Sequence, residues 1–484
     1  MVNLAVESSE MNHYTKPIFN FRRLLTLAIL IALCAMVLPI KPVMAQTPTL
    51  PEYIVVSGDT LYGIADRFKT TIEAIQEVNN MNGNTGLQPG DLLKIPGLEG
   101  LSGILVSDFV PLGASLTVLA RRGQSTVEGL IKLNKITSPS ELFVGREITI
   151  TQNPETLTVA SIPPLLPGES MLEAAVQNQS NYYRLARINT LASPNLALPM
   201  DTYYAPSATQ STNSLAIPGL EEISLGNMPF MQGQTYTIRV KTSQPLKVNS
   251  ELRDLKPGFY PLSENEQIAY GGINALAEPG IYPLTMEFTT ASDLTYRIIQ
   301  YVFVKEGNYV MDSTITVDPA TLEEEANAAE DKLFNDIVSN PSSIQQWSGL
   351  WRSPTAEPIC ITDKFGNRRT YNNDKSKLYF HTGLDLGYCM GIDVFAPAAG
   401  TVVAVKPDQV IRGNAIVIDH GMGIFTTYMH LAKIMVTEGE VVGPGQKIGE
   451  IGNTGRSAGP HLHFQVDANG VHVNPETWLL RVFP

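Results

Sequence analysis

One short unit recurs three times near the N-terminal end of this 484-residue chain, and no other sequence feature constrains the fold as much. The segment Gly58-Asp-Thr-Leu61 returns as Gly113-Ala-Ser-Leu116 and as Gly168-Glu-Ser-Met171, each time 55 positions further on. A second landmark keeps the same period, at Asn79, Asn134 and Asn189. Two landmarks at one constant spacing indicate a small module that is repeated along the chain.

The first copy of this module covers residues 53–97 and has the pattern of a small mixed α and β unit. It predicts a strand, two helices over 60–68 and 71–79, and a closing strand over 92–95. Asp59 or Thr60 can cap the first helix. The later copies, over 108–152 and 163–207, have lost Asp59, so we expect their fold to be retained better than their ligand site.

This β-α-α-β pattern resembles the LysM module, which binds N-acetylglucosamine-containing glycans such as peptidoglycan or chitin. In that family the sugar lies against the loop before the first helix and the loop after the second. The resemblance therefore implies glycan contacts from six residues in these loops, which are Gly58, Asp59, Thr60, Leu61, Asn79 and Asn80. Asp59 and Thr60 could equally serve only as helix caps, and that alternative stays open.

The hydrophobic period changes after the repeats. Between residues 213 and 316, apolar or alternating runs are separated by Pro/Gly turns, which predicts an immunoglobulin-like β-sandwich. This domain would be a spacer or an interaction module. The acidic stretch 319–346 predicts an exposed linker helix that is surrounded by solvent.

The N-terminus predicts export. Arg22 and Arg23 precede an apolar run over 24–38, and Val43-Met44-Ala45 supplies the small residues that a signal peptidase recognises. That run is short for a membrane span, which needs about 20 residues. We expect residues 1–45 to be a signal peptide and the protein to be secreted or held in the cell envelope. An uncleaved anchor is the alternative, and it would be the only contact with the membrane.

The charge balance argues against nucleic acid as a partner. Asp and Glu number 47 against 34 Lys and Arg, which gives a formal net charge of −13. Nucleic-acid binding needs concentrated Lys and Arg to displace counterions. The three cysteines are also too few for a fold of this length built on disulfides.

Histidines concentrate near the C-terminal end, where five of the seven are His381, His420, His430, His461 and His463. Residues i and i+2 of a strand face the same side, so His461 and His463 can point into one cleft. The segment His381-Thr-Gly-Leu-Asp385 adds an imidazole and a carboxylate, and its glycine lets the backbone turn. Nitrogen and oxygen ligands of this kind suit tetrahedral zinc, with one position left for water.

Five motifs follow one another in order, and they are His381-x-Gly-x-Asp385, 413–421, Tyr428-Met-His-Leu431, 443–449 and 454–464. Over residues 352–484 this succession resembles the lysostaphin and LytM type of zinc metallopeptidase, which cuts peptide bonds in bacterial cell walls. The resemblance implies a largely antiparallel β-domain with zinc ligands His381, Asp385 and His463. It also implies that His430 and His461 are catalytic without binding metal, and which of the two is the base stays open.

Several further residues near these motifs receive lesser roles. The family uses a tyrosine near the oxyanion, upstream of the first zinc histidine, and Tyr371 and Tyr379 are both candidates. We interpret His420 as structural and His472 as a surface residue. Cys360 and Cys389 flank the first zinc motif, and in an exported protein they could form a disulfide. The resemblance implies that neither thiolate binds zinc, because the family site is complete without them.

The sequence thus predicts a multidomain, mainly β protein with LysM repeats, an immunoglobulin-like sandwich and a C-terminal antiparallel-β zinc peptidase domain. Its expected function is that of an exported peptidoglycan endopeptidase, which LysM holds on the glycan while the last domain hydrolyses stem or cross-bridge peptides. The alternative is a non-catalytic wall-binding scaffold or an activator of other cell-wall hydrolases. Domains of this family that took that path typically lose zinc ligands, whereas this chain keeps all five site residues.

Overall fold

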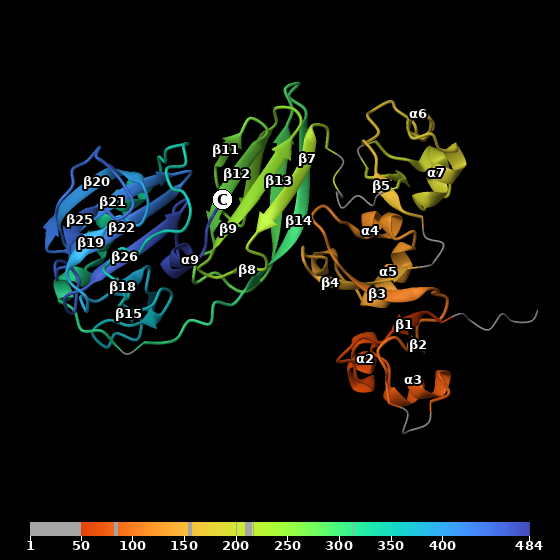
Figure 1. Ribbon diagram of the computed structural model, residues 1–484, viewed down its shortest axis with the longest axis horizontal. Helices are drawn as coiled ribbons and strands as arrows, with labels where there is room; N and C mark the ends of the chain where they lie inside the picture. Colours follow the sequence, from red (N-terminus) through yellow and green to blue (C-terminus); the bar gives the residue numbers. More distant parts are fainter. Residues whose placement is uncertain are drawn as a thin grey trace, which may run out of the picture. The chain divides into compact units, whose positions relative to one another are not determined.

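The computed structural model describes residues 50–81, 86–152, 157–199, 201–208, 215, 217–312 and 314–484. The expected signal peptide over 1–45 lies outside these ranges. In the part of the chain that is described, no helix has both the length and the apolar character needed to cross a bilayer. The predicted mainly β architecture is confirmed (Figure 1).

Each repeat contains the expected pair of helices between two strands (Figure 1). The helices begin at polar caps: Thr60 Oγ1 accepts from Gly63 N at 3.0 Å, and Thr126 Oγ1 accepts from Gly129 N at 3.0 Å. The first two repeats share one sheet in the order β2-β1-β3-β4, because β1 and β3 pair in parallel. The elements are β1 (Glu52–Ile54), α2 (Leu61–Phe68), α3 (Ile72–Val78), β2 (Leu92–Lys94), β3 (Ile104–Phe109), α4 (Leu116–Arg122), α5 (Val127–Asn134), η1 (Pro139–Glu141), β4 (Glu147–Gln152), β5 (Val159–Ser161), α6 (Met171–Gln177), α7 (Tyr182–Ile188), η2 (Pro194–Leu196) and β6 (Tyr204–Pro206).

The asparagine that recurs every 55 residues ties the second helix of each repeat to its closing strand. Asn189 Nδ2 donates to Leu185 O at 2.9 Å and to Tyr204 O at 2.7 Å, and its Oδ1 accepts from Tyr204 N at 2.7 Å. Asn79 and Asn134 make the same three bonds in their own repeats. A carboxamide supplies both donors and the acceptor that this junction needs, which gives the repeated landmark a structural reason.

Residues 220–305 form two four-stranded sheets, in the orders β10-β13-β14-β8 and β11-β12-β9-β7. Side chains from both sheets bury one another, as with Ile238 of β9 and Leu284 of β13, which are both fully buried. The strands are β7 (Leu220–Gly226), β8 (Phe230–Met231), β9 (Thr235–Thr242), β10 (Lys247–Leu252), β11 (Phe259–Ser263), β12 (Glu266–Gly272), β13 (Gly280–Thr289) and β14 (Thr295–Lys305).

The C-terminal region is built on an antiparallel sheet in the order β15-β18-β26-β22-β21-β20-β24, with β27 paired to β26 (Figure 1). A smaller sheet, β19-β25-β23, and the β16-β17 pair complete it. The elements are β15 (Ile361–Asp363), β16 (Arg368–Arg369), β17 (Tyr379–Phe380), β18 (Leu384–Leu386), β19 (Asp393–Phe395), β20 (Gly400–Gln409), β21 (Gly413–Gly421), β22 (Ile424–Leu431), β23 (Lys433–Ile434), β24 (Val441–Val442), β25 (Lys447–Glu450), β26 (Leu462–Ala468), β27 (Val471–Val473) and α9 (Pro475–Leu480).

The acidic stretch before this region contains η3 (Pro319–Leu322) and helix α8 (Glu324–Val338). Our expectation of a helix surrounded by solvent is wrong for one of its faces. Phe334 and Val338 are buried in one apolar cluster with residues of β20, β21 and β22. The Glu330 carboxylate accepts hydrogen bonds from the backbone N–H groups of Ile411 and Arg412, at 2.9 and 3.2 Å. Helix α8 is therefore packed against the C-terminal sheet.

The three tryptophans of the chain, Trp347, Trp351 and Trp478, lie in one core cluster with the C-terminal sheet. Tyr270 of β12 belongs to the same cluster, and Trp478 Nε1 donates to Thr235 Oγ1 at 3.0 Å. Side chains of the sandwich thus complete a core that the last 130 residues do not close alone.

Replacing Asn189 with Ala should destabilise the third repeat by about 3 kcal/mol, because it leaves two buried backbone groups without partners. Hydrogen exchange measured by mass spectrometry on peptides that cover β6 would report the loss as faster exchange. Asn178 is the matched control, since its half-buried side chain makes one bond, to Ala174 O at 2.8 Å. Equal exchange in the Asn189→Ala and Asn178→Ala variants would contradict the role given to Asn189.

Candidate active site

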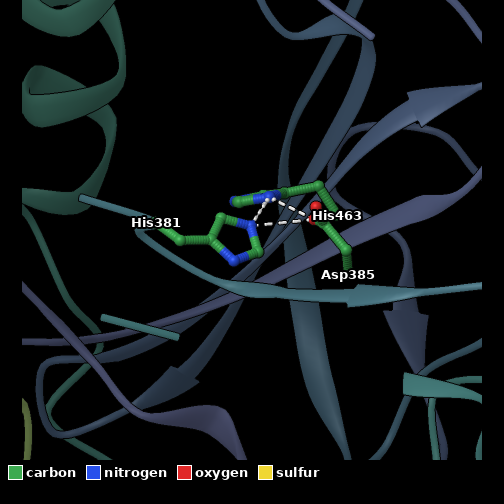
Figure 2. Close-up of side chains that lie close together, drawn as sticks. All are labelled: His381, Asp385 and His463. Atoms are coloured by element: carbon green, nitrogen blue, oxygen red, sulfur yellow. Dashed lines mark hydrogen bonds and ion pairs between the residues drawn. The ribbon is translucent and has the colours of Figure 1, made fainter. Parts of the chain in front are cut away.

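Three ligand-type side chains converge where β18 meets β26. The register pairs Asp385 of β18 directly with His463 of β26, so both side chains project from the same face of the sheet. His381, just after β17, completes the group. Asp385 Oδ1 lies 2.9 Å from His381 Nε2 and 2.9 Å from His463 Nδ1, and the two ring nitrogens are 3.0 Å apart (Figure 2).

Hydrogen bonds behind this triad orient its rings. His381 Nδ1 donates to Lys364 O at 2.9 Å, which leaves the lone pair of Nε2 directed at Asp385 and His463. Burial lowers the pKa of His463 to about 4, although Asp385 opposes that shift. Burial alone would raise the pKa of Asp385, but His381 and His463 hold it well below its usual range. The triad therefore offers a carboxylate and two imidazole lone pairs.

This donor set fits a zinc ion. Two imidazole nitrogens and one carboxylate oxygen are ligands that zinc takes in catalytic sites, where three protein ligands leave a fourth position open. In the absence of a cation, the lone pairs of His381 Nε2 and His463 Nδ1 would face each other 3.0 Å apart. Among the described residues, His381, Asp385 and His463 form the group of metal-ligating side chains that lie close enough to share one ion.

His430 and His461 form a second pair beside the triad. Their ring centroids are 4.9 Å apart, and the His430 ring is 6.1 Å from that of His463. Each donates its Nδ1 proton to a backbone carbonyl, His430 to Thr454 O and His461 to Gly459 O, both at 2.8 Å. The Nε2 atom of each ring therefore keeps a lone pair that can accept a proton. His461 Nε2 lies 3.5 Å from Asp385 Oδ1.

His430 is held in place at a cost in backbone strain. It stands at the end of β22 with φ of 64°, a conformation that a side chain with a Cβ seldom adopts. Its backbone N–H donates to Arg412 O at 2.9 Å. Burial, with His461 and His463 nearby, lowers the pKa of His430 to about 3. This imidazole is therefore neutral near pH 7 and able to accept a proton.

All five residues line one cleft of about 850 Å³. Tyr371 and Tyr379 line it too, with ring centroids 5.0 Å apart, so the choice between them as the oxyanion tyrosine stays open. His420 does not line the cleft. It is fully buried, with Nδ1 bonded to Ala399 O and Nε2 to Thr426 Oγ1, both at 2.8 Å, which fits the structural role expected for it.

Other residues line the cleft that the sequence did not single out. Gln465 follows His463 by two positions in β26, and the i, i+2 rule used for His461 could have found it. His472, interpreted as a surface residue, is partly exposed at the cleft, and β27 places it opposite the buried Asp467, which accepts from its Nδ1. Arg412 and Asn327, the latter on α8, belong to none of the motifs recognised in the sequence. Arg456 lies within the 454–464 motif but was given no role there.

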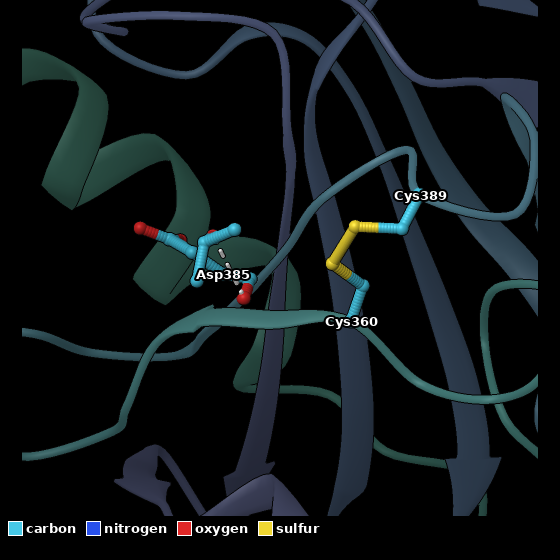
Figure 3. Close-up of a disulfide and its surroundings, with 4 residues drawn as sticks. Cys360, Asp385 and Cys389 are labelled. Carbon is cyan, nitrogen blue, oxygen red and sulfur yellow. Dashed lines mark hydrogen bonds between the residues drawn. A yellow bond between two sulfur atoms is a disulfide. The ribbon is translucent and has the colours of Figure 1, made fainter.

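A disulfide supports the strand that carries Asp385. Cys360 and Cys389 are joined, with their Cα atoms 6.0 Å apart (Figure 3). Cys360 precedes β15 and Cys389 follows β18, so the bond ties β18, which carries Asp385, to its neighbour β15. Gly387 N also donates to Cys360 O at 2.8 Å, and Thr362 Oγ1 donates to Asp385 O at 3.1 Å.

The residues expected to contact glycan lie at the start of the first helix and after the second helix of repeat one, and several serve the fold itself. Asp59 Oδ2 accepts from Tyr53 OH at 2.9 Å and from Val56 N at 2.8 Å, and Thr60 caps α2. Gly58 has φ of 93°, as the turn requires, and Leu61 packs on the core. Asn80 follows Asn79, whose side-chain amide donates both of its protons to backbone carbonyls, those of Ile75 and Lys94. Glycan binding by these residues stays a prediction.

With this geometry, the last domain has the features of a metal-dependent hydrolase: three side chains of the kind that bind metals, two further histidines beside them and an open cleft. Comparison with known protein families identifies the families to which the domains belong. Residues 379–475 match the model of peptidase family M23, and residues 53–96 and 113–151 match the LysM domain. The chain thus contains an M23 metallopeptidase domain and two LysM domains, which confirms the resemblances found in the sequence.

Among the curated relatives, the peptidoglycan DD-endopeptidase ShyA of Vibrio cholerae is 37% identical over 135 residues, which is 28% of this chain and 30% of that protein. The DD-carboxypeptidase/endopeptidase Mpg of Neisseria meningitidis serogroup B is 45% identical over 95 residues, 20% of this chain and 22% of that protein. The match therefore spans less than a third of either relative. The catalytic domain of lysostaphin from Staphylococcus simulans is 29% identical, with a TM-score of 0.20 over 28% of this chain and 93% of that one.

Replacing His463 with Ala should weaken zinc binding at least about a hundredfold. Mutation of a residue that only hydrogen-bonds to a zinc ligand can already lower zinc affinity by about that factor, and this change removes a ligand itself. Titration of the metal-free full chain with zinc by isothermal calorimetry would measure this. The matched control is His472→Ala, which removes an imidazole from the same cleft but not from the triad. If both variants bound zinc like the unmodified chain, the ligand assignment would be wrong.

We expect the buried His420 to make the folded protein less stable in acid. Full burial lowers the pKa of His420 to about 4, so below pH 6.5 the unfolded chain takes up a proton that the folded chain refuses. This group should cost about 3 kcal/mol of stability between pH 7 and pH 4. Denaturant unfolding followed by tryptophan fluorescence reports this core, because Trp351 contacts the His420 ring, with centroids 4.9 Å apart. The pH dependence should be weaker in His420→Asn, and an unchanged slope would contradict the account.

Proposed function

We propose that this protein is an exported, zinc-dependent peptidoglycan endopeptidase that hydrolyses stem or cross-bridge peptide bonds in the cell wall. One observation carries the proposal: His381, Asp385 and His463 converge beside His430 and His461 in the cleft of an M23 domain. Two of the relatives that match part of this chain are named as a peptidoglycan DD-endopeptidase and a DD-carboxypeptidase/endopeptidase.

Zinc would be held by His381 Nε2, Asp385 Oδ1 and His463 Nδ1, whose atoms already face one another. When bound there, zinc supplies a Lewis acid that polarises a carbonyl and lowers the pKa of water. The disulfide and the strand register fix Asp385, and the bond to Lys364 O fixes the ring of His381.

His430 and His461 would handle the protons of the reaction. Each has its Nδ1 proton committed to a carbonyl, so each can accept a proton only at Nε2. A neutral imidazole at this position can take a proton from attacking water, and a protonated one can give it to the leaving amine. His430 is the more buried of the two and has the strongly lowered pKa, which favours its neutral form.

The LysM domains would hold the enzyme on its substrate. Binding to the glycan raises the local concentration of peptide around the cleft without adding any contact to the reacting bond. Peptidoglycan as the partner places the protein in the cell envelope or outside the cell, and the predicted signal segment would direct it there.

The test is digestion of purified peptidoglycan by the zinc-loaded chain, with the released fragments analysed by mass spectrometry. We expect new peptide termini on intact glycan. His461→Ala should keep zinc but lose about 10²- to 10⁴-fold in rate, as is typical when a proton-transfer group is removed.

The control is His420→Asn, which changes a histidine of the same domain outside the cleft. A zinc-loaded chain that binds peptidoglycan but releases no fragments would overturn the proposal and leave the wall-binding scaffold in its place.

A further inference from the structure

Three arginines line the catalytic cleft, and one of them has no acidic partner. Arg369 is paired with Asp363, and Arg412 is paired with Asp331 at 2.7 Å and Glu330 at 3.4 Å. Arg456 makes no ion pair within 4.0 Å in the part of the chain that the structure describes. A cation that lines a cleft without a carboxylate partner is available to a ligand.

The fold holds the Arg456 side chain from two sides. Its Nη1 donates to Thr321 O of η3 at 3.2 Å and to Asn327 Oδ1 of α8 at 2.8 Å. The guanidinium carbon also lies 5.1 Å from the centroid of the Tyr371 ring. These contacts immobilise the side chain in advance, so little conformational entropy remains to be lost when a ligand binds.

The contacts leave most of the hydrogen-bonding capacity of Arg456 unused. A guanidinium has five N–H donors, and the two on Nη1 are engaged. Among the described residues, Nε and Nη2 have no acceptor within hydrogen-bonding distance. Nε and one N–H of Nη2 form the fork that binds a carboxylate through two parallel hydrogen bonds.

Arg456 also stands close in sequence to the reacting groups. It belongs to the loop that leads into His461, where Ser457 Oγ is 3.2 Å from His461 Nδ1. The backbone N–H of Arg456 donates to Ile411 O at 2.8 Å, next to the Arg412 carbonyl that accepts from His430 N. A ligand held by Arg456 would therefore lie along the cleft that both catalytic histidines line.

We propose that Arg456 is a carboxylate-binding subsite that selects peptides with a free carboxylate near the scissile bond. Helix α8 and η3 would then be parts of the substrate site, because they orient the guanidinium. This inference rests on the proposed function and gives the substrate a chemical class: an acidic peptide rather than a neutral one such as a glycine bridge.

The experiment uses a synthetic peptidoglycan stem peptide, with each of its carboxylates replaced in turn by a carboxamide. For the unmodified zinc-loaded chain, one of these replacements should raise KM about ten- to one-hundredfold, with a smaller change in kcat. Arg456→Gln should lose this discrimination and treat both peptides alike. Arg456→Lys should restore part of it, since it keeps the charge but not the fork.

The matched control is Arg297→Gln, which removes an exposed arginine on β14 of the sandwich. Tryptophan fluorescence would verify that each variant is folded. If Arg456→Gln discriminated between the peptides as the unmodified chain does, the subsite would be disproved. The subsite would also be disproved if Arg456→Gln lowered the cleavage rates of the carboxylate and carboxamide peptides by the same factor. The arginine would then only support the loop.

A second measurement separates this inference from the proposed function. Calorimetry of the metal-free full chain with the same peptide pair measures binding without turnover. Tighter binding of the carboxylate form that is lost in Arg456→Gln would support the subsite even if no peptide were cleaved. Equal binding of both forms to the unmodified chain would overturn it.

Discussion

The register between β18 and β26 is the constraint on which the site depends. It places Asp385 of β18 opposite His463 of β26. On the other side of β26, Met429 of β22 lies opposite His463, and His430 is the next residue of β22. A shift of one residue would turn every one of these side chains to the other face. The apolar residues that alternate with them, such as Leu462 and Phe464, are fully buried, and their burial resists such a shift.

Much of the polar site depends on segments that are distant in sequence. Helix α8 buries Phe334 and Val338 against the sheet and supplies Glu330, whose carboxylate binds the turn between β20 and β21. That turn carries Arg412, whose backbone carbonyl oxygen accepts the hydrogen bond from His430 N. A stretch that is acidic in composition thus helps to define the wall of the cleft. Its charge is used in specific contacts, which composition alone does not reveal.

The sequence was sufficient for the β-rich fold class, the M23 and LysM resemblances, and the five residues that the structure gathers in the cleft. The i, i+2 spacing of His461 and His463 and the turn within His381-Thr-Gly-Leu-Asp385 are local rules. The division of the five residues into zinc ligands and catalytic histidines, and the role of His430, came from the resemblance to the lysostaphin and LytM family. The sequence was not sufficient for Arg456 or for the buried face of α8, because their partners lie about 75 to 135 positions away. The structural use of Asn79 was missed for a different reason: its partner Lys94 is only 15 positions away, but it belongs to the closing strand, and the pairing appears only when the repeat folds. The bond between His472 and the buried Asp467 was also missed, because the two residues meet only when β27 pairs with β26.

The central claim is that two imidazoles and one carboxylate hold a zinc ion at this strand junction. X-ray absorption at the zinc edge of the loaded full chain tests it most directly. The account predicts a four-coordinate shell of nitrogen and oxygen at about 2.0–2.2 Å that contains two imidazoles. A sulfur ligand at about 2.3 Å, or a shell of oxygen atoms without imidazole, would contradict it.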